Sequence, residues 1–298
     1  MKAQESRGLW LGALGVTIFA LTLPMTRLAV GTPDAPQMSG VFIALGRAAV
    51  AAGLSLLFLV ATRAPLPKRD EWLPLAITSA GVVFGFPLFT SVAMRHVEAV
   101  HASVIVGVLP LATAAVAARL HNQRPSTGFW LCAALGSALV VGFALLRSGQ
   151  AGLHIHPADL LLLAAMACAA VGYAYGARLS QRMRADHVIC WALVMALPLT
   201  LPAALWTLPP APVKASAWWA FAYVAVFSMW LGFFAWYRGL ALGGTVRVSQ
   251  VQLVQPFLGM LFAVPLLGES LDAVTLGFAA AVIATVFIGK KMPVRAAA

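Results

Sequence analysis

The sequence predicts an all-α polytopic membrane protein, and its composition and its hydropathy both point to this class. Of the 298 residues, 61% are hydrophobic and only 10% are charged, whereas soluble domains carry about 25% charged residues. The mean hydropathy is +0.90. No connection between apolar windows is long enough to hold a soluble domain, so every functional group is expected inside the helical bundle or at its two mouths.

Apolar windows of about 20 residues, the length that crosses a bilayer as one helix, occur ten times. We expect these spans at residues 9–30, 39–62, 72–93, 99–119, 128–146, 158–178, 188–207, 216–238, 246–266 and 271–289. The first window resembles a signal peptide, but it is too long and lacks a convincing cleavage site. We therefore expect it to remain as the first helix.

Basic residues are distributed unevenly between the two faces that ten spans create. Counting connections alternately from the N-terminal tail, fifteen of the 20 Lys and Arg residues fall on the side of that tail, four fall opposite, and Arg47 lies within a span. Basic loops stay in the cytoplasm, so both termini are predicted to be cytoplasmic. The net charge of +11 then reflects topology. A nucleic-acid partner, which needs a contiguous basic face, is not expected.

The chain contains a weak internal repeat. A shift of 146 residues aligns Ser103 with Ser249 and Pro110 with Pro256. We therefore expect two five-helix halves, residues 1–150 and 151–298. Because five is odd, the second half enters the membrane from the opposite face. This is the inverted-repeat layout of many secondary transporters, whose sites lie near the midplane on interrupted helices.

These features resemble the EamA-type transporters of the drug/metabolite superfamily. Besides the ten helices in two halves and a proline in the fourth and ninth helices, the resemblance rests on LLGES at 266–270, TRLA at 26–29 and Gly46-Arg47. The chain departs from the pattern where Asn122-Gln123 replaces the Gly-Glu of the second half. The resemblance implies export of small metabolites across the bacterial inner membrane. Among such proteins the chain is most similar to the YddG-type exporters of aromatic and other neutral amino acids.

The predicted ninth helix carries the most informative polar residues. One stripe at helical spacing holds Ser249, Gln252, Pro256 and Gly259, with Gln255 at its edge. Polar groups at this depth normally face a bundle interior or a cavity. Amides both donate and accept hydrogen bonds, which suits a zwitterion or a polar neutral solute. In the alternative interpretation these side chains only bond neighbouring helices.

The corresponding stripe of the fourth helix is far less polar. It carries Ser103, but Val106 and Leu109 stand where the ninth helix has Gln252 and Gln255. The two halves are thus predicted to share a backbone design and to differ in chemistry. The substrate-specific contacts are expected on the unpaired glutamines.

Further candidate residues come from four other helices. Phe86, Phe227 and Trp230 could stack a planar substrate or gate its path, or they could form an interfacial belt. Thr22 lies on a polar face of the first helix. Arg47 could grip a carboxylate or phosphate, or it could snorkel or cap backbone carbonyls. Helix breaks or hinges are expected at Gly85, Pro87, Gly107, Pro110, Pro256 and Gly259.

All nine acidic residues lie in tails, in loops or at the ends of spans. Ion-coupled carriers usually place a carboxylate within the membrane, so uncoupled export by alternating access is favoured. The expected partners are the substrate and the lipid bilayer, without cofactor, metal or enzymatic activity, and the choice between monomer and homodimer stays open. The alternatives are an exporter of lipophilic or cationic drugs or of other metabolites, and a non-transporting membrane scaffold.

Overall fold

The computed structural model describes residues 2–96, 102, 106–147, 157–209, 212–267 and 273–296. Six helical runs in this part of the chain are long and apolar enough to cross a membrane. They are Ala3–Val30, Gly40–Ala61, Arg69–Ala93, Pro157–Leu179, Ala185–Trp206 and Ala215–Gly243. These runs are the first, second, third, sixth, seventh and eighth predicted spans, so the prediction of a polytopic helical membrane protein is confirmed.

The other four predicted spans correspond to helices that are not among these six runs. They are α7 (Leu109–Leu120), α8 (Thr127–Arg147), the run from α13 to α14 (245–267) and α15 (Ala273–Gly289). The fourth window was expected to start at residue 99, but α7 starts ten residues later, after a turn at Gly107 and Val108. The total of ten spans therefore stays a prediction.

Four of the spans are not continuous α-helices. The first divides into α1 (Lys2–Ala20) and α2 (Thr22–Val30). The third consists of η1 (Arg69–Glu71), α4 (Trp72–Thr78), a π-helical segment η2 (Ser79–Gly85) and α5 (Phe86–Ala93). The eighth consists of α11 (Ala215–Tyr223), the π-helical η3 (Val224–Leu231) and α12 (Gly232–Gly243). The ninth consists of α13 (Thr245–Val248), the 3₁₀-helical η4 (Ser249–Val254) and α14 (Gln255–Leu267). By contrast, α3 (Gly40–Ala61), α9 (Pro157–Leu179) and α10 (Ala185–Trp206) run without interruption.

Prolines account for three of the four interruptions. A proline has no N–H to give to the carbonyl four residues earlier, and its ring crowds that carbonyl. Pro24 is four residues beyond Ala20, where α1 ends. Pro87 is likewise four residues beyond Val83 in η2, and Pro256 is four residues beyond Gln252 in η4. The eighth span has no proline near its π-helical segment, which is followed directly by Gly232.

The two π-helical segments occupy matching places in the two halves of the chain. The segments η2 and η3 begin 145 residues apart and end 146 residues apart, in agreement with the shift that aligns the prolines of the fourth and ninth spans. π-Helical turns are rare and are found mostly at functional sites. Their recurrence supports a two-repeat architecture more strongly than the few identical residues do.

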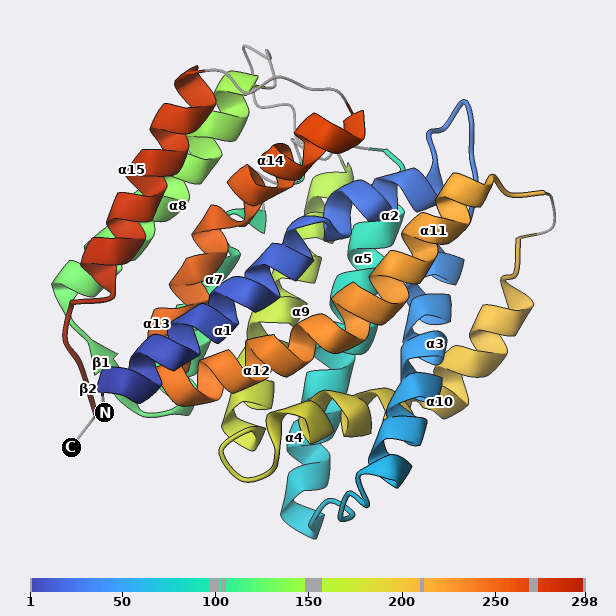
Figure 1. The fold of residues 1–298 in the computed structure, drawn as a ribbon, viewed down its shortest axis with the longest axis horizontal. Coiled ribbons are helices and arrows are strands. Elements are labelled where there is room, and N and C mark those ends of the chain that lie inside the picture. The colour runs from blue at the N-terminus through green and yellow to red at the C-terminus, as the bar shows by residue number, and fades with distance from the viewer. Residues whose placement is uncertain are drawn as a thin grey trace.

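The helices form a bundle in which segments distant in sequence lie side by side (Figure 1). Helix α1 packs along α12, α3 along α10, and α8 along α15 at one edge of the molecule. Both chain ends lie at the same end of the bundle. There β2 (Val294–Ala296) pairs antiparallel with β1 (Gln123–Pro125). At the same end, the Glu5 Oε1 atom lies 3.4 Å from the Arg247 Nη1 atom.

The contact between α1 and α12 depends on glycines. A Cβ atom on Gly239 would lie 2.6 Å from the backbone nitrogen of Gly12 and 2.9 Å from the carbonyl oxygen of Gly8. Backbone atoms cannot give way as a flexible side chain does. Small residues of this kind let membrane helices approach closely.

We expect Gly239→Ala to lower the free energy of unfolding by about 1–3 kcal/mol, because the added methyl group overpacks this crossing. The matched control is Gly53→Ala on α3, where nothing lies within 4 Å of the position that the added methyl group would take. Thermal unfolding of the detergent-solubilised protein measures both variants. Equal melting temperatures would contradict the close crossing.

Candidate functional site

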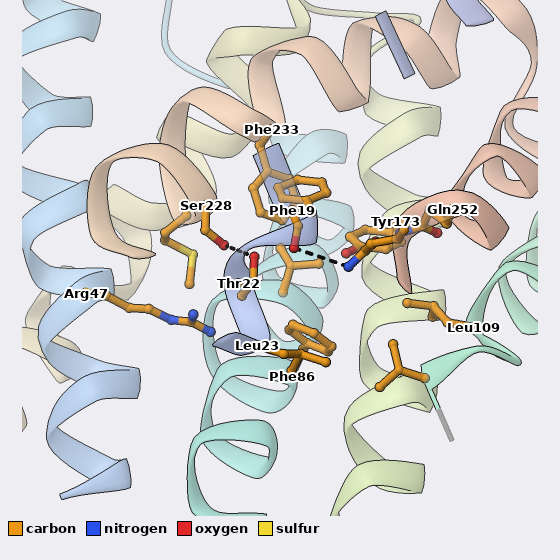
Figure 2. Close-up of a pocket in the computed structure, with 14 residues that line it drawn as sticks. Phe19, Thr22, Leu23, Arg47, Phe86, Leu109, Tyr173, Ser228, Phe233 and Gln252 are labelled. Carbon is orange, nitrogen blue, oxygen red and sulfur yellow. Dashed lines mark hydrogen bonds between the residues drawn. The ribbon is translucent and has the colours of Figure 1, made fainter. Parts of the chain in front are cut away.

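A central cavity lies where the four interrupted spans meet (Figure 2). It comprises about 500 Å³ of empty space, including its open mouth. The gaps between its side chains admit only water-sized molecules, so a metabolite must displace some of its walls. The 14 lining residues are Phe19, Thr22, Leu23, Arg47, Val82, Phe86, Val106, Leu109, Tyr173, Ser228, Met229, Phe233, Gln252 and Gln255.

The two halves of the chain contribute chemically different walls. Three positions of the first half and their equivalents 146 residues later all line the cavity. These pairs are Val82 with Ser228, Val106 with Gln252, and Leu109 with Gln255. In each pair the first half supplies an apolar side chain and the second half a polar one. These paired positions form an apolar wall from the first half and a hydrogen-bonding wall from the second half, while Thr22 and Arg47 add polar groups from the first half.

A buried hydrogen bond joins the first span to the π-helical segment of the eighth span. The hydroxyl groups of Thr22 and Ser228 lie 2.8 Å apart, and both side chains are almost wholly buried. Figure 2 shows this bond at the cavity wall. It holds the first residue of α2 against η3, one residue after the break at Leu21.

Gln255 links the ninth span to the same break. Its amide Nε2 donates to the carbonyl oxygen of Phe19 at 3.3 Å, as Figure 2 shows. The hydroxyl of Tyr223 donates to the neighbouring carbonyl of Ile18 at 2.8 Å. A Cβ atom on Gly259 would lie 3.2 Å from the Ala20 carbonyl oxygen. The second half of the chain thus covers the carbonyls that the broken first span exposes.

Gln252 presents an unused acceptor in the cavity. Its side chain is 5% exposed, and its Oε1 atom is buried without a hydrogen-bond partner. Tyr173 of α9 lies beside it (Figure 2). A buried amide oxygen without a donor is costly, so this atom is available to a polar group of a ligand.

Arg47 extends from the middle of α3 toward the cavity (Figure 2). Its side chain is 1% exposed, and its Nε and Nη1 atoms are buried without hydrogen-bond partners. None of the 14 lining residues is acidic. The sequence left open whether this guanidinium snorkels, caps carbonyls or contacts substrate. The structure shows neither snorkelling nor a hydrogen bond to a carbonyl within the described residues.

Five predicted site residues line the cavity, three others are described and do not line it, and one is outside the described residues. The five are Thr22, Arg47, Phe86, Gln252 and Gln255. Phe227 is 46% exposed and stacks on Tyr223 with the ring centroids 5.4 Å apart. Trp230 packs edge-on against Phe58 and Phe234. Ser249 donates to the Val246 carbonyl at 3.1 Å, and Ser103 lies outside the described residues.

Phe227 and Phe233 of the eighth span lie in two different environments. They are six residues apart, about 240° around a regular α-helix, so they do not share a face. Phe233 lines the cavity, whereas Phe227 is 46% exposed.

The predicted hinge residues lie at element boundaries or close crossings. Gly85 ends η2, where its added Cβ would lie 2.5 Å from the Cys168 Sγ atom. Pro87 and Pro110 fall in the first turns of α5 and α7, and Pro256 is the second residue of α14. Gly107 belongs to the turn before α7.

Several lining residues were absent from the predicted site, and two kinds of signal point to them. The shift of 146 residues applied to the glutamines leads to Val106 and Leu109. Ser228 is the one hydroxyl-bearing residue in the apolar stretch 224–231. No comparable signal singles out Leu23, Met229 or Tyr173, whose position depends on the packing of whole helices.

We expect Thr22→Val and Ser228→Ala to be coupled, because each removes one side of the same buried hydrogen bond. A double-mutant cycle should give about 0.6–1.7 kcal/mol, the range for such bonds within membranes. Reversible unfolding in mixed micelles provides the measurement. As control, Thr22→Val is combined with Ser180→Ala, since Ser180 bonds only locally to the Gly176 carbonyl among the described residues. Those two changes should be additive within about 0.5 kcal/mol.

Comparison with known proteins agrees with this geometry. A crystal structure of another protein superposes on 95% of this chain and 98% of its own with a TM-score of 0.74 at 16% identity, which shows a shared fold. The uncharacterized transporter YdeK of Bacillus subtilis (strain 168) is 42% identical over 260 residues, which cover 87% of this chain and 88% of YdeK. The sequence pattern of the EamA-like transporter family matches residues 6–146 and again 156–289. The chain therefore belongs to the EamA-like transporter family, as a multi-pass membrane protein.

Proposed function

We propose that this transporter exports small neutral metabolites, foremost aromatic and other neutral amino acids, by alternating access across the bacterial inner membrane. The observation that carries the proposal is the central cavity with one apolar and one hydrogen-bonding wall. An amino acid with an apolar side chain presents the same division, because its polar end and its side chain lie at opposite ends of a small molecule. Phe86 and Phe233 offer aromatic surface to a planar group.

Two other functions fit the cavity less well. A carrier of cationic drugs needs negative charge to compensate its substrate in a low-dielectric site, whereas the 14 described lining residues include a guanidinium and no acid. A non-transporting scaffold would gain nothing from buried polar atoms without partners, such as Gln252 Oε1, because each of them lowers stability. Transport of a small molecule accounts for both features.

Alternating access requires the cavity walls to separate toward one side of the membrane at a time. In the described conformation the cavity is narrow, and the segments η2, η3 and η4 all contribute to its lining. We place the pivots at these segments, between halves at residues 1–150 and 151–298 in inverted orientation. Both chain ends lie at one end of the bundle, and the excess of basic residues on that side favours the cytoplasm.

We expect Gln252→Val to reduce export of neutral amino acids at least tenfold. The substitution gives the second half the side chain that Val106 has in the first half and removes an amide from the hydrogen-bonding wall. Efflux of radiolabelled phenylalanine or leucine from proteoliposomes provides the measurement. Phe227→Leu is the matched control, because this exposed ring lies on the same bundle and does not line the cavity. The absence of flux for every neutral amino acid with wild-type protein would contradict the proposed substrate class.

We expect the rate of this efflux to be independent of an imposed pH gradient. Among the described residues no Asp, Glu or His lines the cavity, and proton-coupled carriers usually titrate such a group within the membrane. The measurement compares proteoliposomes with equal internal and external pH against proteoliposomes with a gradient of one unit. Uphill accumulation of substrate driven by the gradient would disprove uncoupled transport.

A further inference from the structure

We propose that Arg47 binds the carboxylate of the transported molecule, and that the cavity selects its substrates by this carboxylate and not by an amino group. The proposal rests on the proposed transport function and adds the chemical class that the site recognises. It assigns to Arg47 a direct role that the sequence left undecided between a structural group and a substrate contact.

The first argument concerns the cost of the buried guanidinium. Charged side chains are almost never fully buried unless a partner compensates them. Arg47 is 1% exposed, and no hydrogen bond connects its guanidinium to any residue in the described ranges. Nε and Nη1 are both buried without partners. The protein therefore keeps up to five N–H donors and a positive charge in a place where its own atoms do not use them.

The second argument concerns the alternatives to a ligand. Snorkelling requires the head group to reach the interface, but Arg47 lies in the eighth position of a 22-residue helix and points to the central cavity. Tyr173 is the residue whose phenol interacts with Arg47 electrostatically, and a neutral phenol cannot cancel its charge. None of the described residues that line the cavity is acidic. We therefore assign the compensating negative charge to the molecule that occupies the cavity.

Counting charges identifies the anion as a carboxylate. Arg47 is the only basic residue among the lining residues, so the site provides a single positive charge. A carboxylate matches one guanidinium in both charge and geometry through two parallel hydrogen bonds. A phosphate monoester near pH 7 carries close to two negative charges and would leave one of them uncompensated in the membrane interior.

An amino group receives much weaker recognition. The described cavity offers it one unpartnered neutral acceptor, Gln252 Oε1, and no carboxylate. A zwitterionic amino acid can thus bind, but the same molecule without its ammonium group retains the main contact with Arg47. The apolar remainder faces Val82, Phe86 and Val106. The predicted ligands are small carboxylates with an apolar or aromatic side chain, whether amino acids or oxo acids.

Binding to the purified wild-type protein tests this selection directly. Thermal unfolding is measured in chloride-free buffer with four probes of the same aromatic skeleton: phenylalanine, phenylpyruvate, phenylalaninamide and phenethylamine. The first two should raise the melting temperature and the last two should not. Equal stabilisation by phenethylamine, no stabilisation by either carboxylate, or the same stabilisation by chloride alone would each overturn the proposal.

Substitutions of Arg47 separate substrate contact from a structural role. Arg47→Gln should weaken phenylpyruvate binding at least tenfold, and Arg47→Lys should retain part of it, because an ammonium keeps the charge and loses the bidentate geometry. Without ligand, Arg47→Gln should melt no lower than wild type, since the change removes an uncompensated buried charge. The matched control is Arg182→Gln, an exposed arginine paired with Asp70 at 3.0 Å. A large drop in the melting temperature of ligand-free Arg47→Gln would favour a structural role and contradict the proposal.

These outcomes are distinct from failure of the proposed function. If carboxylates bind through Arg47 but no neutral amino acid crosses the proteoliposome membrane, the export proposal fails and the Arg47 assignment stands. If wild type and Arg47→Gln export phenylalanine equally well, the transport proposal stands and the Arg47 assignment fails.

Discussion

A bilayer offers no water to an interrupted helix, so each carbonyl that leaves a helical ladder must find a donor inside the protein. This constraint ties the described spans together. The carbonyls of Ile18 and Phe19, next to the break of the first span, accept hydrogen bonds from Tyr223 and Gln255. Gln250 of the ninth span also donates across the two halves, to the Pro110 carbonyl in the first turn of α7. Because donor and acceptor belong to different halves, the breaks of one half are stable only when the other half is in place.

The same constraint explains how a repeated scaffold can acquire a specific cavity. Equivalent backbone positions, such as those of Val106 and Gln252, point to one space because the halves share their interruptions. Their side chains are free to differ, since the main-chain design fixes only where they point. Gln255 serves both purposes, because it satisfies the break at Phe19 and borders the cavity. By contrast, the Gln250 amide nitrogen donates to the Pro110 carbonyl of the first half, and Ser249 donates to the Val246 carbonyl of its own span.

The sequence predicted correctly those features that depend on hydropathy summed over many residues. Hydropathy summed over about 20 residues located six long spans to within a few residues, because burial in lipid depends on composition. It failed where the orientation of single side chains decides the outcome. Phe227 of the eighth span is exposed and Phe233 lines the cavity, and hydropathy does not distinguish the two rings. Pro24 was the visible sign of the break at Leu21, whereas Tyr173 reaches the cavity only through the packing of α9 against its neighbours.

The buried charge of Arg47 also bears on how a bound ligand changes the energy of the closed cavity. Closing a dry cavity around an unpaired guanidinium is costly, because the charge loses solvent without gaining a partner. A bound carboxylate neutralises that charge and forms hydrogen bonds with it, so the loaded cavity closes at lower cost than the empty one. Occupancy would then favour the occluded state through differential affinity, which is the condition for any ligand-driven conformational change. In that case, a single uncompensated charge in the cavity links substrate recognition to the movement of the two halves.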